Sequence, residues 1–169
     1  LVDALARADA PVVRRAVGAT TRLADPARCG RPHDLSLRPA IPDGAHAGVA
    51  DVRQQLASVT TLDLTGQYPA ALDLARAALT RAEALAWPPL IAEARARVGL
   101  MQTRVGEFAA AEQSLADAYV AAGTAGASEV IADAALDLVD AAREQAHRAE
   151  ALAWGKAATV ALAAIGAGD

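Results

Sequence analysis

The stretch Gly66-Gln67-Tyr68-Pro69-Ala70-Ala71 recurs about 40 residues later as Gly106-Glu107-Phe108-Ala109-Ala110-Ala111. A weaker third copy, Ala146-His147-Arg148-Ala149-Glu150-Ala151, follows at the same spacing; it keeps the final alanine but loses the glycine and the aromatic residue. Because alanine is abundant in this chain, alanines match often by chance. The matching glycine and aromatic residue are therefore the main evidence for a repeat. The spacing predicts an internal repeat of about 40 residues.

Each repeated position has a physical role in a helical hairpin. A glycine between two antiparallel helices can adopt the left-handed conformation that ends the first helix, which predicts C-terminal caps at Gly66 and Gly106. The aromatic residue can tuck under the start of the second helix, and a following alanine allows close helix approach. We therefore expect packing roles for Tyr68, Phe108, Ala71 and Ala111, and for Ala78, Ala118 and Ala158 further along the same register.

Composition favours an all-α fold. Hydrophobic residues make up 54% of the 169 residues and aromatic residues only 3%, so alanine, leucine and valine must build the core. Alanine and leucine are strong helix formers, and residues that favour strands are few. The pattern predicts first helices over residues 47–65, 88–105 and 128–145, and second helices over residues 68–86, 108–122 and 148–165.

Breaks in the sequence support these boundaries. Pro88 and Pro89 suit the first turn of a helix, and Ser128 is expected to cap the next first helix after the glycine-containing stretch 123–127. Upstream, residues 1–8 and 11–23 are expected to be helical. The proline-rich segment 24–44 is predicted to be a connector that either packs on the array, anchored by Leu35, Leu37 and Ile41, or is partly mobile.

The repeated Gly-x-aromatic-x-x-Ala pattern on helical hairpins resembles the tetratricopeptide repeat, in a longer variant of about 40 residues. The resemblance implies a right-handed α-α superhelix of three hairpins over residues 45–169 (about 47–86, 88–122 and 128–165), with residues 1–44 as an N-terminal extension. The run from Leu1 through Val17 and on to Cys29 is similar to the segment that precedes such repeats in large bacterial serine/threonine protein kinases. That likeness implies a non-catalytic module of a kinase.

In tetratricopeptide arrays the first helices line a concave groove that holds a protein or peptide. The family's groove positions can be transferred to this sequence by aligning the three repeats at Gly66, Gly106 and Ala146. The groove residues of the first helix would then be Arg53, Leu56, Ala57, Thr60, Asp63 and Leu64. Those of the second would be Glu93, Ala96, Arg97, Leu100, Thr103 and Arg104. Those of the third would be Asp133, Leu136, Asp137, Asp140, Arg143 and Glu144.

Such a groove has both charge signs and would suit a peptide with both signs, anchored near Leu56, Leu100 and Leu136. Family members that clamp a terminal carboxylate use lysine and asparagine. This sequence has no asparagine, and its single lysine, Lys156, lies outside these groove positions, so that ligand class is not expected.

No catalytic residue, cofactor or metal site is predicted. The kinase motifs that phosphoryl transfer requires are absent from the sequence. His33, His46 and His147 lie far apart and form no zinc-binding pair. Cys29, His33 and Asp34 could outline half a metal site or a nucleophile with its base, but solvated polar residues of a loop are the better interpretation.

Charge and hydropathy restrict the partners further. The formal net charge is -4 and basic residues form no cluster with aromatics, so no nucleic acid is expected. No apolar run is long enough to span a membrane, and a single cysteine with no signal segment favours the cytoplasm. The start at Leu1 suggests a piece of a longer protein. Two alternatives stay open: a self-assembly element that stacks through Val160, Leu162 and Ile165, and a sensor that regulates a linked enzyme.

Overall fold

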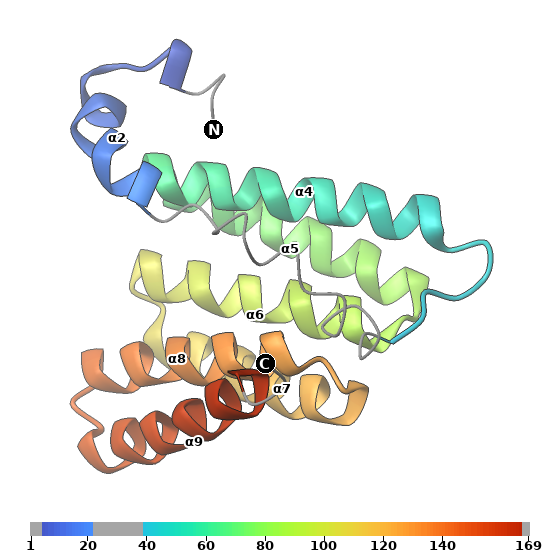
Figure 1. Cartoon of the computed structure of the whole chain (residues 1–169). Helices are drawn as coiled ribbons and strands as arrows, with labels where there is room; N and C mark the ends of the chain where they lie inside the picture. Colours follow the sequence, from blue (N-terminus) through green and yellow to red (C-terminus); the bar gives the residue numbers. More distant parts are fainter. Residues whose placement is uncertain (1–4, 22–38, 167–169) are drawn as a thin grey trace.

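The computed structural model describes residues 5–21 and 39–166, and this part of the chain is all-helical, without strands. The all-α prediction is therefore confirmed. Figure 1 shows the helices following one another across the molecule, from α2 at one end to α9 at the other. Their bounds are α2 Ala10–Thr21, α4 His46–Thr65, α5 Tyr68–Leu85, α6 Pro88–Val105, α7 Phe108–Ala125, α8 Ser128–Glu144 and α9 Arg148–Gly166.

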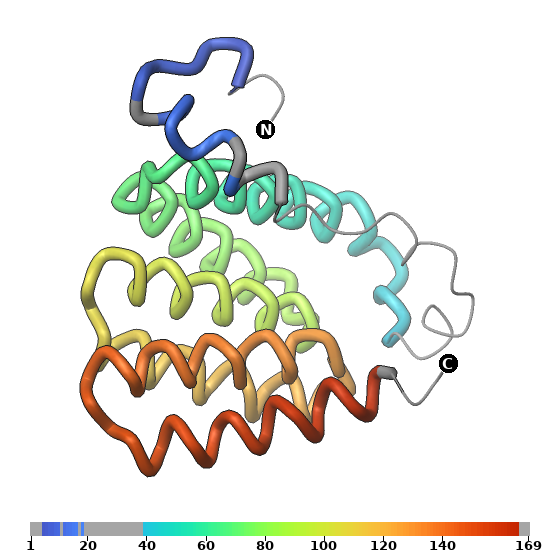
Figure 2. The backbone as a smooth tube through the Cα atoms, turned by 60° about the vertical axis from the view of Figure 1, so that its left-hand side comes forward, coloured from blue at the N-terminus to red at the C-terminus, as the bar shows by residue number. Residues whose placement is uncertain are grey.

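Consecutive helices from α4 to α9 pack against each other and form three helical hairpins, α4–α5, α6–α7 and α8–α9. The tube in Figure 2 passes through these hairpins in sequence order. The first helices also meet one another, because α6 contacts both α4 and α8. Side chains of α6 can therefore contact side chains of both α4 and α8.

A residue in the left-handed conformation follows each helix from α4 to α8, and these residues are evenly spaced along the chain. Gly66, Gly106 and Gly126 have φ angles of 82°, 87° and 67°. Ala86 and Ala146 occupy the two other positions with φ angles of 51° and 59°. At Gly66 the next amide, that of Gln67, donates to the Leu62 carbonyl at 2.9 Å, which satisfies a carbonyl that the helix end would otherwise leave free.

The core consists mainly of alanine, leucine and valine, as the composition predicts. Ala71 and Ala111 are fully buried, and Ala78, Ala118 and Ala158 are buried, one in each hairpin. Tyr68 and Phe108 are half-buried. Small side chains at these positions let the two helices of a hairpin approach closely, so the repeat in the sequence is a repeat of packing positions.

The predicted helix boundaries agree with the structure within three residues at every end of the six helices α4 to α9. The largest difference is in α7, which continues through Gly123 to Ala125 instead of ending at residue 122. The predicted cap at Ser128 is wrong. Ala127 occupies the N-cap position of α8 and no side chain caps this end. Ser128 is the first residue of the helix, so its hydroxyl is not at the capping position.

The N-terminal helix α2 packs on α4. Arg15 lies over the Tyr68 ring, 5.3 Å from the centroid, and its Nη1 donates to the Tyr68 hydroxyl. Ile41 packs against the core at the other end of the first hairpin, as expected for an anchor of the connector. Leu35 and Leu37, and most of the connector, lie outside the described residues.

Candidate functional site

The residues expected to line a groove lie on α4, α6 and α8. We call the surface formed by these predicted groove residues the first-helix face. Equivalent positions of successive hairpins become neighbours on this face. Arg53 of α4 donates from Nε to Glu93 Oε2 of α6 at 3.3 Å. The guanidinium of Arg53 also lies 5.4 Å from the ring centroid of Trp87. Arg53 is thus held by an acid and by an aromatic ring of the second hairpin.

A second ion pair joins the same two helices near their C-terminal ends. The Nε of Arg104 donates to Oδ1 of Asp63 at 3.1 Å. Asp63 is only 7% exposed, whereas the Arg104 side chain is partly open to solvent. A buried carboxylate needs a partner, because removing its charge from water is costly. Arg104 therefore has a structural role on this face.

The charges of α6 and α8 meet around Asp137, which is half-buried. The pKa of the Asp137 carboxyl is raised from 3.8 to about 7, mainly by burial and then by the negative charge of Asp133. Arg97 and Arg104 oppose this rise in pKa from α6, and Asp140 adds to it. Five of the predicted residues thus form one electrostatic cluster that spans two helices.

Arg97 differs from the other arginines of the first-helix face. Within the described residues it forms no ion pair or side-chain hydrogen bond, although it lies close enough to Asp137 to lower its pKa. Arg143, in contrast, pairs with Asp140 of its own helix at 3.2 Å. Among the described residues, Arg97 is therefore the arginine of this face that has no side-chain partner at ion-pair distance.

The remaining positions divide between core and surface. Leu56 is buried in the core cluster of the first hairpin, which contradicts its predicted role as a surface anchor, and Leu64 and Ala96 are also buried. Leu100 is half-buried, and Leu136 is 45% exposed. Thr60 and Thr103 donate their hydroxyls to backbone carbonyls of their own helices, those of Leu56 and Gly99. The exposed positions without a further role are Ala57 and Glu144.

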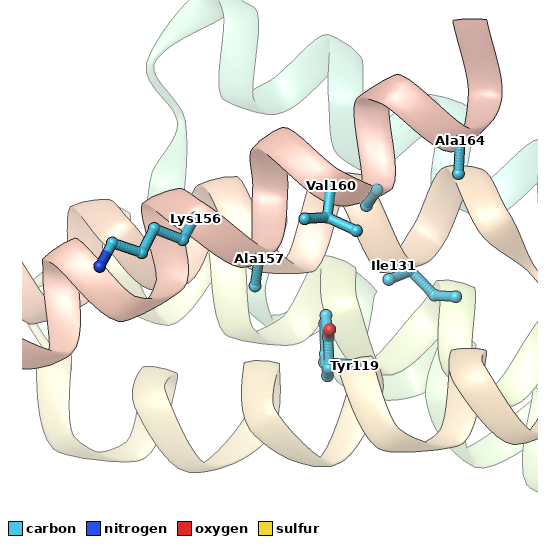
Figure 3. Close-up of a pocket in the computed structure, with 7 residues that line it drawn as sticks. Tyr119, Ile131, Lys156, Ala157, Val160 and Ala164 are labelled. Atoms are coloured by element: carbon cyan, nitrogen blue, oxygen red, sulfur yellow. The ribbon is translucent and has the colours of Figure 1, made fainter. Parts of the chain in front are cut away.

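A second feature, which the sequence did not indicate, is an open hollow of about 340 Å³ beside α9. Figure 3 shows Ala157, Val160 and Ala164 of α9 near Tyr119 of α7 and Ile131 of α8. The Tyr119 ring meets the Trp154 ring edge to face, with centroids 5.2 Å apart. The hollow is mainly apolar, and its lining is Tyr119, Ile131, Lys156, Ala157, Val160, Ala161 and Ala164.

Metal-binding clusters and membrane-spanning helices are absent from the described residues. No group of three or more histidine, cysteine, aspartate and glutamate side chains there could hold a metal ion. His147, at the turn between α8 and α9, has its Nδ1 3.6 Å from Oε2 of Glu112 on α7. His46 is exposed. Cys29, His33 and Asp34 lie outside the described part of the chain. No described helix has the length and hydropathy needed to cross a bilayer.

Comparison with known proteins gives no match to a protein-family model, to a curated protein or to a solved structure.

Proposed function

We propose that residues 46–166 form a tetratricopeptide-type array, a right-handed superhelix of three hairpins, which binds a partner peptide or protein on its first-helix face. Three features support this. Left-handed helix ends recur at even spacing, a buried alanine recurs at the equivalent position of each hairpin, and α6 contacts both neighbouring first helices. A stack of this kind builds an extended surface from the same helix of each hairpin.

One observation carries the binding role: side chains of α6 and α8 form a charged cluster in which Arg97 has no ion-pair partner among the described residues. Asp133 and Asp140 provide negative charge nearby, and Asp137 adds to it at pH values above its raised pKa of about 7. An extended peptide with charges of both signs complements such a surface. Leu136, exposed on the same helix, supplies an apolar contact.

The test is a charge reversal at Arg97. We expect the native chain to capture a partner from the lysate of the source cell, and Arg97→Glu to lose it. Arg148→Glu is the matched control, because Arg148 is exposed on α9, away from this face. Circular dichroism must show equal helicity for all three proteins. Equal capture by Arg97→Glu and the native chain would contradict the proposal.

We also propose, from the resemblance of the segment Leu1 to Cys29 alone, that the array belongs to a bacterial serine/threonine kinase. In that setting it would position a substrate or a regulator in the cytoplasm and would not itself perform catalysis. The coding sequence upstream of Leu1 tests this directly. A Gly-rich loop followed by His-Arg-Asp and Asp-Phe-Gly motifs would support it, and an open reading frame without them would refute it.

A further inference from the structure

The helix α9 has an exposed face, and most of the equivalent positions in α5 and α7 are buried or half-buried. We define the α9 end face as Leu152, Gly155, Lys156, Thr159, Leu162 and Ala163. Leu152 is 70% exposed and Leu162 is 49% exposed. Subtracting 80 from each number gives the equivalent positions in α5, and subtracting 40 gives those in α7, because the second helices of the three hairpins share one register.

In α5 these positions form the contact with the next hairpin. Leu72, equivalent to Leu152, is 4% exposed and belongs to a core cluster with Val98 and Met101 of α6. Ala82, equivalent to Leu162, is fully buried in a cluster with Leu90 and Ala94 of α6. The α5 helix therefore buries this face against the first helix of the hairpin that follows it.

The same face of α7 is covered in the same way. Leu115, equivalent to Gly155, is fully buried in a cluster with Leu138 and Ala141 of α8. Glu112, equivalent to Leu152, accepts a hydrogen bond from Gln145 at 2.9 Å, at the turn of the third hairpin. Two interfaces in one molecule thus show what this face binds: the first helix of a hairpin, together with the turn after it.

Charge defines the occupant more closely. Lys156 is equivalent to Arg76 of α5, which pairs with Glu107 in the turn of the next hairpin at 3.0 Å. Lys156 is exposed and has no acidic partner among the described residues. A hairpin seated on α9 in the register of the α5–α6 contact would bring its turn to Lys156. An acidic residue at that turn would complete the equivalent ion pair.

A second copy of this chain does not fit the requirement. Its first helix, α4, has Ala50, Gln54 and Ser58 where α6 has Leu90, Ala94 and Val98, and these α4 residues are exposed. Its turn carries the neutral Gln67 where the second hairpin carries Glu107. Two α9 helices in a symmetric pair would place two Lys156 ammonium groups together near the middle of the contact, which is unfavourable.

We propose that the α9 end face binds a helical hairpin of a partner protein, apolar on its first helix and acidic at its turn. The two leucines are the apolar anchors. Gly155 and Thr159 between them, and Ala163 next to Leu162, are small enough for the incoming helix to approach closely. The α9 end face does not include Arg97 or Asp137, so the charge reversal at Arg97 distinguishes the first proposal from this one.

The test uses the full chain and a synthetic hairpin of residues 87–126, which packs on the equivalent face of α5. The probe is covalently stapled between its two helices, and circular dichroism must show that it is helical before use. We expect saturable binding with one probe per chain, followed by fluorescence anisotropy. Leu152→Glu with Leu162→Glu should weaken binding by at least about tenfold, since both anchors are removed.

A charge exchange tests the register independently of folding. Lys156→Glu should weaken binding of the native probe by about two- to fivefold, and the probe with Glu107→Lys should restore it. Val120→Glu, which alters an exposed side chain of α7 outside the α9 end face, should bind the probe like the native chain. No saturable binding, or equal binding by the double leucine variant, would overturn the proposal, as would a charge exchange without rescue. If the chain forms a homodimer and the double leucine substitution abolishes it, the α9 end face binds a second copy of the chain and the proposal is wrong.

Discussion

Asp63 of α4, only 7% exposed, accepts a hydrogen bond from Arg104 of α6 at 3.1 Å. The two residues lie in successive hairpins, and their pairing fixes the second hairpin against the first. Arg104 also contributes to the electrostatic field at Asp137 of α8. This arginine therefore links the charges of all three first helices.

Removal of Arg104 should destabilise the chain. Arg104→Ala leaves the Asp63 carboxylate buried without its partner, and we expect a loss of about 2 kcal/mol in the free energy of unfolding. Urea denaturation followed by circular dichroism measures it. Arg76→Ala is the control, because its pair with Glu107 is exposed on both sides and should contribute less than about 1 kcal/mol. Equal losses in the two variants would contradict the structural role of Asp63.

Stability should depend on pH through Asp137. Its pKa rises from 3.8 to about 7 on folding, mainly because of burial, so the folded chain binds this proton more tightly than the unfolded chain. The contribution to stability therefore falls as the pH rises from about 4 to 7 and is constant above that. The full difference amounts to at most about 4 kcal/mol.

Asp137→Asn isolates this effect, because asparagine cannot ionise. We expect the variant to be more stable than the native chain at pH 8 and to differ little from it near pH 4. Urea denaturation across this pH range gives both curves. A native chain whose stability relative to Asp137→Asn stays constant between pH 4 and pH 8 would show that Asp137 keeps an ordinary pKa.

The left-handed Ala146 should be a site where glycine stabilises the fold. Ala146 has a φ angle of 59°, which costs a residue with a Cβ about 1 kcal/mol or more. We expect Ala146→Gly to raise the free energy of unfolding by about 1 kcal/mol, since glycine adopts this conformation without strain. Thermal and urea denaturation measure the change.

Two alanine substitutions provide the matched controls for the left-handed caps. Gly106 has a φ angle of 87° and open space around it, so Gly106→Ala should cost about 1 kcal/mol through backbone strain alone. Gly123 lies inside α7 with equally open space, and Gly123→Ala should stabilise the helix by about 0.5 to 1 kcal/mol. Changes of the same sign at the two glycines would refute the assigned conformations.

Gly99 should tolerate no larger side chain. A Cβ at this position would lie 2.5 Å from Cγ of Leu115 and 3.2 Å from its backbone nitrogen, so Gly99→Ala should push α7 away from α6 and cost about 1 to 3 kcal/mol. Gly155→Ala is the comparison, because a Cβ at Gly155 would meet no atom within 4 Å and alanine favours the helix. A stabilising Gly99→Ala would contradict the close α6–α7 contact.

The sequence was sufficient to predict the features that depend on local physics. Gly66 and Gly106 end their helices in the left-handed conformation as predicted, and the repeated alanines are buried. The left-handed conformation of Ala86 and Ala146 could not be predicted, although Ala146 aligns with the two glycines, because alanine seldom adopts this conformation and nothing local marks it. Their place in an evenly spaced series with the glycines was the available signal.

The details of the first-helix face depend on tertiary packing and were predicted less well. The carried-over register placed Leu56 on the surface, whereas a core cluster shared by the first hairpin and α6 buries it. The shifted pKa of Asp137 follows from neighbours on another helix, which the sequence does not place. The exposed leucines of α9 could have been found by comparing each position with its equivalents in the two preceding hairpins.

Photo-crosslinking tests the central claim, that the first-helix face is the docking surface, most directly. A photoreactive phenylalanine replaces either Leu136, which is exposed on α8 within this face, or Val120, which is exposed on α7 outside it. After irradiation in the lysate of the source cell, we predict a crosslinked partner at position 136 and none at position 120. A partner crosslinked at position 120 but not at position 136 would contradict the claim.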